Sequence, residues 1–218
     1  IDPEDSKSRQ YVASMVDACA CAGKFIEKWY GTKADLISYG AADVIPSPKV
    51  KKLWDVAYFG RHEVDTGFKE YIEGFAIAAK MQPLKLLVLG SGSLTNWAKT
   101  FVKKHKLNAT FKGFVEEPNA FLPTARVVFV SGYLGIIEAA ALGLPIVANF
   151  NTPIKEDYLR LHPIAKHLGI SSTPEDIASK FVEALKLPKK QIDEAQAWAK
   201  AQTWDKVAQE YLRLYEGK

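Results

Sequence analysis

The chain has 218 residues, of which 48% are hydrophobic and 25% are charged, and this is the composition of an ordinary globular protein. No apolar run approaches the roughly 20 residues that a membrane-spanning helix needs, and no secretory signal is present. The formal net charge is +4, but no nucleic-acid-binding motif accompanies the basic runs, so we expect no DNA or RNA partner.

The chain begins with Ile1 rather than Met, so we expect a fragment of a longer polypeptide. We place it in the cytoplasm, and its basic runs leave a peripheral contact with an anionic membrane open. Cys19 and Cys21 are interpreted as small buried hydrophobic residues in a reducing compartment rather than as metal ligands. The sequence does not determine the oligomeric state.

Short apolar runs alternate with helical segments along the chain. Strands are predicted at 17–22, 35–39, 55–59, 85–89, 109–113, 127–131 and 145–149. Helices are predicted at 24–30, 66–81, 94–106, 119–125, 134–142, 154–162 and 174–187. Near-continuous apolar strands separated by helices indicate a parallel sheet that is covered on both faces. The predicted fold class is therefore α/β, a doubly wound parallel sheet with helices on both faces.

The segment "AADVIPSPKVKKLW" predicts a domain boundary, because its two prolines, its serine and its basic cluster are typical of a linker. We assign the linker to 45–54. Residues 1–44 form a strand–helix–strand piece that is too small to bury a core alone. Residues 55–187 form the main domain, and residues 188–218 form two C-terminal helices.

The turns that follow the strands are the candidate binding site, because ligands of open parallel sheets lie beyond the carboxyl ends of the strands. Glycines occur at three of these turns, at Gly60, at Gly90 with Gly92, and at Gly135. At such positions the backbone approaches a neighbour closely or takes a positive φ. A helix that begins there offers free N–H groups and a positive dipole end to an anion.

The "GSGS" turn at 90–93 resembles part of a dinucleotide-binding fingerprint, but Thr95 occupies the place of the third glycine. A dinucleotide-dependent oxidoreductase is therefore disfavoured, and no P-loop is present. Two interpretations stay open: the turn lines a ligand, or it is a plain turn in which Ser93 caps the next helix.

Arg61 directly follows a glycine at a strand end. Its planar guanidinium suits bidentate binding of a phosphate. The alternative is a surface ion pair with Glu63 or Asp65.

Glu138 is the one carboxylate in "SGYLGIIEAAALGLPIVANF". If the helix begins near Leu134 or Gly135, Glu138 lies in its first turn, where the helix dipole favours an anion by roughly 0.3–1 kcal/mol. It then either stabilises the helix start or accepts hydrogen bonds from a ligand. A carboxylate can accept two O–H donors, and the diol of a ribose provides them.

Several segments in order resemble the retaining glycosyltransferases of family 4, which have the GT-B architecture. "GIIEAAALGLPIVA" resembles their E-A-x-A-x-G-x-P-V-V segment, and "YFGR" resembles the hydrophobic-G-R that opens their C-terminal domain. "LKLLVLGSG", "ATFKGFV", "STPEDIASKFVEAL" and "TWDKVAQEYLRLY" resemble later segments of that domain. "VDACACAGKF…ISYGAADV" resembles the end of the N-terminal domain, so the resemblance covers most of the chain.

This resemblance implies a Rossmann-like C-terminal domain that binds a nucleoside-diphosphate sugar, with transfer to an unidentified acceptor, retention of configuration and no metal or other cofactor. Glu138 would hold the ribose hydroxyls, Arg61 and the Gly135 turn the diphosphate, and Phe114 and Val115 the base. The other donor contacts implied are Gly60, Gly90, Gly92, Tyr133 and Leu134, and Lys69 would act with Arg61 as a catalytic cation. We expect the isolated fragment to be inactive, because most of the acceptor domain is missing.

Two positions depart from the family pattern. An earlier glutamate is replaced by Val130, in a turn that looks shortened. The family lysine five or six residues after the arginine is replaced by Thr66 and Gly67, so that Lys69 is displaced into the helix. The alternative function is therefore a non-catalytic relative that binds a nucleotide or a protein partner.

Overall fold

The structure is a computed structural model that describes residues 3–43 and 50–217. Six parallel strands form the main sheet: β3 (Trp54–Phe59), β4 (Lys85–Leu89), β5 (Asn108–Gly113), β6 (Ala125–Phe129), β7 (Ile146–Asn149) and β8 (Leu168–Ser171). Their order is β5-β4-β3-β6-β7-β8. A separate parallel pair, β1 (Ala20–Cys21) and β2 (Leu36–Ile37), lies in the N-terminal segment with α1 (Pro3–Ala13) and α2 (Lys24–Tyr30).

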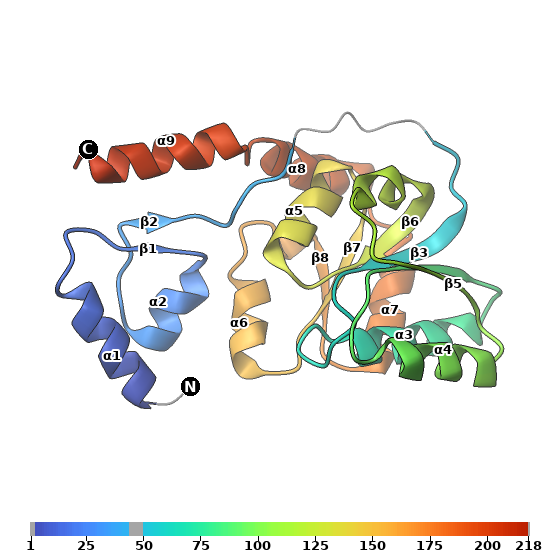
Figure 1. Cartoon of the computed structure of the whole chain (residues 1–218). Coiled ribbons are helices and arrows are strands. Elements are labelled where there is room, and N and C mark those ends of the chain that lie inside the picture. The colour runs from blue at the N-terminus through green and yellow to red at the C-terminus, as the bar shows by residue number, and fades with distance from the viewer. Residues whose placement is uncertain (1–2, 44–49, 218) are drawn as a thin grey trace.

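Helices cover both faces of the main sheet (Figure 1). One face carries α3 (Phe68–Ala79), α4 (Thr95–Lys104) and α7 (Pro174–Ala184), and the other carries α5 (Tyr133–Ala141) and α8 (Lys189–Lys200). The remaining helices are α6 (Pro153–Arg160), which follows β7, and α9 (Trp204–Tyr215) at the C-terminus. This arrangement confirms the predicted doubly wound α/β fold.

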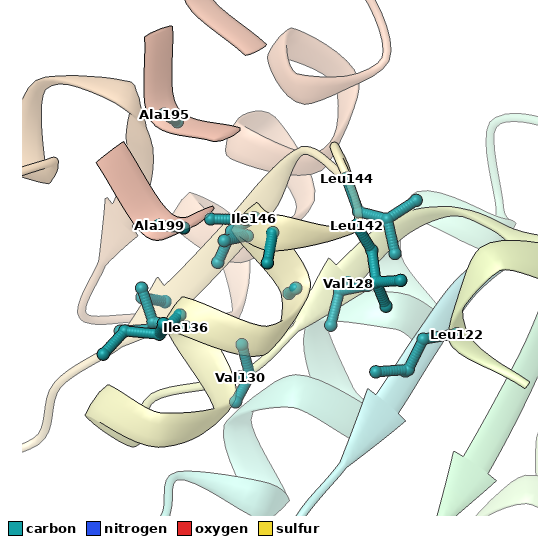
Figure 2. Packing of buried hydrophobic residues seen from close by; sticks show 14 of the residues in the cluster. Leu122, Val128, Val130, Ile136, Leu142, Leu144, Ile146, Ala195 and Ala199 are labelled. Carbon is teal, nitrogen blue, oxygen red and sulfur yellow. The ribbon is translucent and has the colours of Figure 1, made fainter. Parts of the chain in front are cut away.

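The two faces arise because successive side chains of a strand point in opposite directions. Val127 and Phe129 pack with α3 and α7, whereas Val128 and Val130 pack under α5 and α8. Figure 2 shows the second of these cores, in which Val128 and Val130 share one cluster with Ile136 of α5 and with Ala195 and Ala199 of α8. Near-continuous apolar strands are therefore required, since both faces are buried.

The strand order reverses beside β3. From β3 the chain moves outward to β4 and β5, and then returns to the other side of β3 as β6. The helices after β3 and β6 consequently lie on opposite faces, which opens a crevice at the carboxyl ends of these two strands.

The predicted strands and most of the predicted helices are confirmed, apart from shifts at their ends. The helix predicted at 119–125 is wrong: two short 3₁₀ turns, Pro118–Ala120 and Leu122–Thr124, precede β6. Two prolines keep this segment from continuing as an α-helix. The edge strand β8 and the helix α1 were not predicted, because β8 is only partly buried and α1 lacks an apolar stripe.

The predicted linker lies partly outside the described residues, which omit 44–49, and its last residue, Trp54, begins β3. The proposed domain limits therefore stay predictions. Within the described ranges, no helix has the length and apolar character needed to cross a lipid bilayer.

A buried hydroxyl joins α3 to the ends of β6 and β7. The Tyr71 hydroxyl contacts the Ser131 hydroxyl, donates to the Val147 carbonyl at 3.2 Å and accepts the Asn149 N–H at 2.7 Å. Tyr71 is 1% exposed, so water cannot replace these partners without opening the core.

Replacing Tyr71 with Phe should therefore lower the free energy of unfolding by about 1–3 kcal/mol, because buried polar groups lose their partner. Urea denaturation of both proteins measures this difference. Tyr11→Phe is the matched control, since Tyr11 is 66% exposed, and it should change stability little. Equal stability of the Tyr71→Phe variant and the parent would contradict this role of the hydroxyl.

Candidate functional site

A cavity of about 320 Å³ lies at the carboxyl ends of β3 and β4. Its lining residues are Phe59, Gly60, Arg61, Leu89, Gly90, Ser91, Phe114, Val115 and Pro118. Five residues predicted from the sequence therefore meet here: Gly60, Arg61, Gly90, Phe114 and Val115. Most of the walls are apolar, with one guanidinium at the edge, and Phe114 is 78% exposed. This combination suits a flat, partly apolar ligand that carries a negative charge.

Glycine is required at position 90 by a close backbone contact. A Cβ on Gly90 would lie 2.0 Å from the Gly60 carbonyl oxygen, and its φ of +113° is rarely adopted by other residues. The Gly90 N–H donates to the Gly113 carbonyl at 2.7 Å. This contact holds the ends of β3, β4 and β5 together around the cavity.

Gly92 does not line this cavity. A Cβ there would lie 2.6 Å from both a carboxylate oxygen of Glu63 and the His62 carbonyl oxygen. Gly92 therefore allows the β4–α4 turn to pack against the β3–α3 loop.

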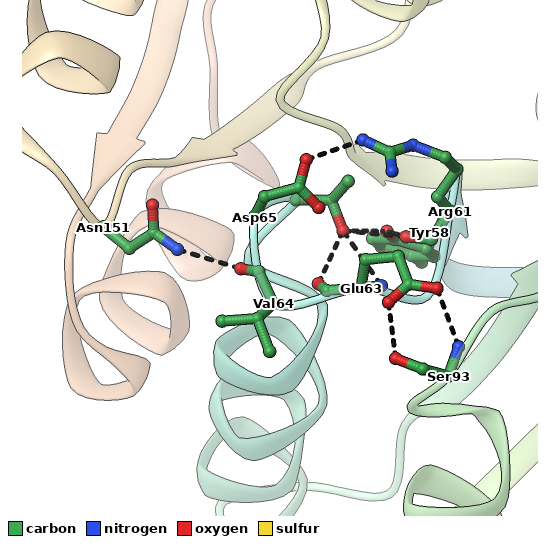
Figure 3. Close-up of polar contacts among 8 residues, drawn as sticks. Tyr58, Arg61, Glu63, Val64, Asp65, Ser93 and Asn151 are labelled. Carbon is green, nitrogen blue, oxygen red and sulfur yellow. Dashed lines mark hydrogen bonds and ion pairs between the residues drawn. The ribbon is translucent and has the colours of Figure 1, made fainter.

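The β3–α3 loop is held by its own side chains (Figure 3). The Tyr58 hydroxyl and the Thr66 hydroxyl both donate to the Arg61 carbonyl, at 2.6 and 2.8 Å. The Glu63 carboxylate accepts the Ser93 N–H at 2.8 Å and the Ser93 hydroxyl, and these bonds lower the pKa of Glu63. Ser93 thus joins the two loops rather than capping α4.

Arg61 forms an ion pair with Asp65 at 2.6 Å (Figure 3). This confirms one of the two interpretations of Arg61 and leaves the phosphate interpretation open. Both side chains are about two-thirds exposed, at 67% and 64%, so the pair contributes only about 0–1 kcal/mol. Replacing Asp65 by a phosphate as the partner of the guanidinium would therefore cost little free energy.

His62, which adjoins Arg61, is buried and has a structural role. It is 1% exposed, its Nδ1 lies 2.8 Å from the Thr95 hydroxyl, and its ring stacks on Phe68 with centroids 4.1 Å apart. Burial lowers the pKa of His62 to about 4, so the ring is neutral at physiological pH. Thr95, whose identity argued against a dinucleotide fingerprint, is therefore the partner of this histidine.

The start of α5 packs against the wall of the cavity. A Cβ on Gly135 would lie 2.6 Å from Val130 Cγ2 and 2.9 Å from Phe59 Cζ, and Phe59 lines the cavity. The Tyr133 N–H donates to the Tyr158 hydroxyl at 2.5 Å. Among the residues that the structure describes, no acceptor binds the N–H of Leu134 or Gly135, so two donors at the positive end of this helix are free.

Tyr133, Leu134 and Gly135 line a second cavity, of about 610 Å³, between α5, the N-terminal segment and α9. The Tyr133 ring stacks on Tyr158 with centroids 3.7 Å apart, and its hydroxyl donates to the Tyr158 carbonyl. These contacts hold the Tyr133 side chain among aromatic neighbours.

Glu138 lies in the second turn of α5 because the helix begins at Tyr133, so the prediction that it occupies the first turn is wrong. It is partly buried, and no ion pair or hydrogen bond of its carboxylate is present among residues 3–43 and 50–217. Burial raises the pKa of Glu138, and the nearby charge of Asp43 adds to the effect. The helix dipole therefore does not account for this carboxylate.

Lys69, predicted to act with Arg61, lies elsewhere. Its ammonium pairs with Glu73 at 3.8 Å and lies 5.9 Å from the centre of the Trp97 ring, and Lys69 does not line the cavity. Another cation, Lys155 of α6, lies near enough to Arg61 and Asp65 for their charges to act on its pKa. No sequence signal marked Lys155, because its neighbours come from distant parts of the chain.

The model of the family described as glycosyl transferases group 1 matches residues 43–202, which include every residue of the first cavity. The chain belongs to this family. No curated protein matches the sequence significantly.

Solved structures share the fold of this chain. A structure of Anabaena HepE in complex with UDP has a TM-score of 0.77 and 15% identity, and the match covers 100% of this chain and 69% of HepE. A mutant of S. aureus TarM, solved with fondaparinux, alpha-GlcNAc-glycerol and UDP, has a TM-score of 0.73 and 16% identity over 96% of this chain and 46% of TarM.

The pneumococcal O-GlcNAc transferase GtfA, solved with UDP and GlcNAc, has a TM-score of 0.67 and 13% identity, with 97% of this chain and 43% of GtfA covered. The chain thus spans less than half the length of TarM and GtfA. At these identities the likeness shows the fold, a Rossmann-like domain of the GT-B kind.

Replacing Gly90 with Ala should destabilise the chain by at least about 2 kcal/mol, because the methyl group meets a carbonyl and the backbone conformation becomes strained. Gly132→Ala is the matched control, since a Cβ there meets nothing within 4 Å. Thermal unfolding compares the two. Equal unfolding midpoints would show that the β3–β4 contact tolerates a side chain.

Proposed function

We propose that this chain is the donor-binding half of a retaining glycosyltransferase, of the family 4 kind, that transfers a sugar from a nucleoside diphosphate to an acceptor. The observation that carries the proposal is the cavity at the ends of β3 and β4, with Arg61 at its edge and the start of α5 against its wall. Family membership supports a transferase acting on glycosyl donors. UDP occupies the structures of HepE and TarM that share this fold.

Each part of a nucleoside diphosphate has a candidate partner. The base would stack in the apolar part of the cavity, against Phe114 and Val115. The diphosphate would lie between Arg61 and the free N–H groups of Leu134 and Gly135. As the glycosidic bond breaks, negative charge grows on this leaving group, and a fixed cation with oriented N–H dipoles stabilises it.

Glu138 would accept hydrogen bonds from the ribose hydroxyls. Gly135 and Glu138 are three residues apart on α5, so they share a face of the helix, and Gly135 contacts the cavity wall at Phe59. A half-buried carboxylate without a protein partner is costly. A ribose diol would remove this cost by donating two hydrogen bonds to it.

The acceptor would approach from the side of the second cavity, which the N-terminal segment helps to form. We propose that transfer needs no metal and that this chain alone does not catalyse it. We also propose that the enzyme works in the cytoplasm, where its basic surface allows peripheral contact with a membrane. In this proposal, the predicted domain 55–187 binds the donor, and the predicted segment 1–44 belongs to the acceptor domain.

A second candidate is a relative that binds a nucleotide or a partner without catalysis. Val130 occupies the place of an upstream glutamate of family 4, and it is 5% exposed in the core beneath α5. No carboxylate can therefore act from that position. Such a protein would keep the binding cavity and lack the transfer reaction.

The proposal predicts that one of UDP, GDP and ADP stabilises the chain in a thermal-shift panel, whereas NAD does not. At 100 times the dissociation constant, a ligand adds about 2.7 kcal/mol to the free energy of unfolding, which is on the order of 5–10 °C for a chain of this size. Glu138→Gln should lose most of this shift, by about 1.5–3 kcal/mol.

The unliganded Glu138→Gln variant should be at least as stable as the parent, because burial disfavours the charge that it removes. A lost shift therefore cannot be ascribed to misfolding. Glu175→Gln, which changes an exposed carboxylate on α7, is the control and should keep the shift. The absence of any shift with all three diphosphates would refute donor binding and favour a partner-binding protein.

A further inference from the structure

Lys155 occupies a position that is unfavourable for a cation. It is the third residue of α6, where the positive end of the helix dipole repels a positive charge. It is partly buried, and among the described residues no carboxylate forms an ion pair with it. Burial lowers the pKa of the Lys155 ammonium. The unliganded protein therefore contains a partly buried lysine that forms no ion pair among the described residues, with only the nearby charge of Asp65 to offset its own.

The ammonium of Lys155 lies beside the start of α5. It sits 5.0 Å from the centre of the Tyr158 ring, which stacks on Tyr133. The hydroxyl of Tyr158 also accepts the Tyr133 N–H at the first residue of α5. The Tyr158 side chain thus contacts both the Lys155 ammonium and the start of α5, where the N–H groups of Leu134 and Gly135 are free.

The loop before α6 also contacts the loop that carries Arg61. The Asn151 side chain donates to the Val64 carbonyl at 2.9 Å (Figure 3). A Cβ on Gly67 would lie 2.5 Å from the Asn149 amide nitrogen, so the two segments pack closely. Three groups that favour an anion therefore follow three neighbouring strands of the sheet: Arg61 after β3, the start of α5 after β6, and Lys155 after β7.

We propose that Lys155 is a second diphosphate-binding cation, which shares with Arg61 the anion of the nucleotide donor. The inference rests on the proposed function and adds a residue to that site. A diphosphate carries more than one negative charge, whereas Arg61 supplies a single positive charge. Lys69 lies beside Glu73 of α3 and Trp97 of α4, on the sheet face opposite α5, so we assign the second cation to Lys155 instead. Binding of the diphosphate would give the Lys155 ammonium the direct anionic partner that it lacks among the described residues of the free protein.

The test compares three ligands that differ only in phosphate. For whichever of UDP, GDP and ADP binds most tightly, the affinities of the diphosphate, the monophosphate and the free nucleoside are measured by calorimetry with the full chain. Lys155→Met keeps the length and the apolar stem of the side chain but removes its charge. Arg160→Met removes a charge from the same helix more than a turn away, where Arg160 pairs with Glu156, and it serves as the control.

Lys155→Met should weaken binding of the diphosphate by about ten- to a hundredfold, as expected for the loss of a charged hydrogen bond. Binding of the monophosphate should weaken less, and binding of the nucleoside should not change. Lys155→Arg should restore part of the diphosphate affinity, and Arg160→Met should behave as the parent does. Circular dichroism melting of the free variants should show no loss of stability for Lys155→Met.

Unchanged diphosphate affinity in Lys155→Met would overturn the role of Lys155 while leaving the proposed function intact. An equal loss for diphosphate, monophosphate and nucleoside would also overturn it, because that pattern belongs to a structural role in the Tyr158 cluster. If the parent protein binds none of the three diphosphates, the proposed function fails, and the role of Lys155 fails with it.

Discussion

The contact between Gly135 and the ring of Phe59 is the constraint on which the site depends. Because residue 135 has no side chain, the first turn of α5 lies directly against an aromatic wall of the cavity. The positive end of a helix and an apolar slot consequently share one crevice, at the point where the strand order reverses. A larger residue would separate them, and a nucleotide could not reach both.

The surrounding loops hold this crevice open through contacts that do not use its ligand-binding groups. His62 with Thr95, and Glu63 with Ser93, fix the loops after β3 and β4 to each other. The guanidinium of Arg61 is left at the surface in a weak ion pair. A charged ligand can therefore displace Asp65 from Arg61 without disturbing the contacts that join the two loops.

The N-terminal segment reaches the site through aromatic packing. Phe25 and Tyr39 both contact Tyr133. Tyr39 also contacts His162, which meets Trp198 of α8. Burial lowers the pKa of His162 to about 4, so this cluster is uncharged at physiological pH. The start of α5 is therefore held from both sides, by Phe59 of the main sheet and by Phe25 and Tyr39 of the N-terminal segment.

The sequence was sufficient to predict β3 to β7 of the main sheet, because strands buried on both faces need continuous apolar runs. It was also sufficient to place Arg61 and Phe114 together at the carboxyl ends of these strands. The half-buried edge strand β8 and the 3₁₀ turns around Pro118 gave no comparable pattern. Whether Glu138 lies in the first or the second turn of α5 depends on the residue at which the helix begins. The first N–H of the helix, that of Tyr133, is bound by the Tyr158 hydroxyl, which comes from α6. Lys155 could not be predicted either, because its neighbours at the site come from distant parts of the sequence.

A crystal structure of the chain with its nucleoside diphosphate tests the central claim most directly. The account predicts the base against Phe114 and Val115, the phosphates between Arg61 and the N–H groups of Leu134 and Gly135, and the ribose hydroxyls on Glu138. A nucleotide bound away from the ends of β3 and β6, or a Glu138 carboxylate that turns to solvent while the nucleotide is bound, would contradict it.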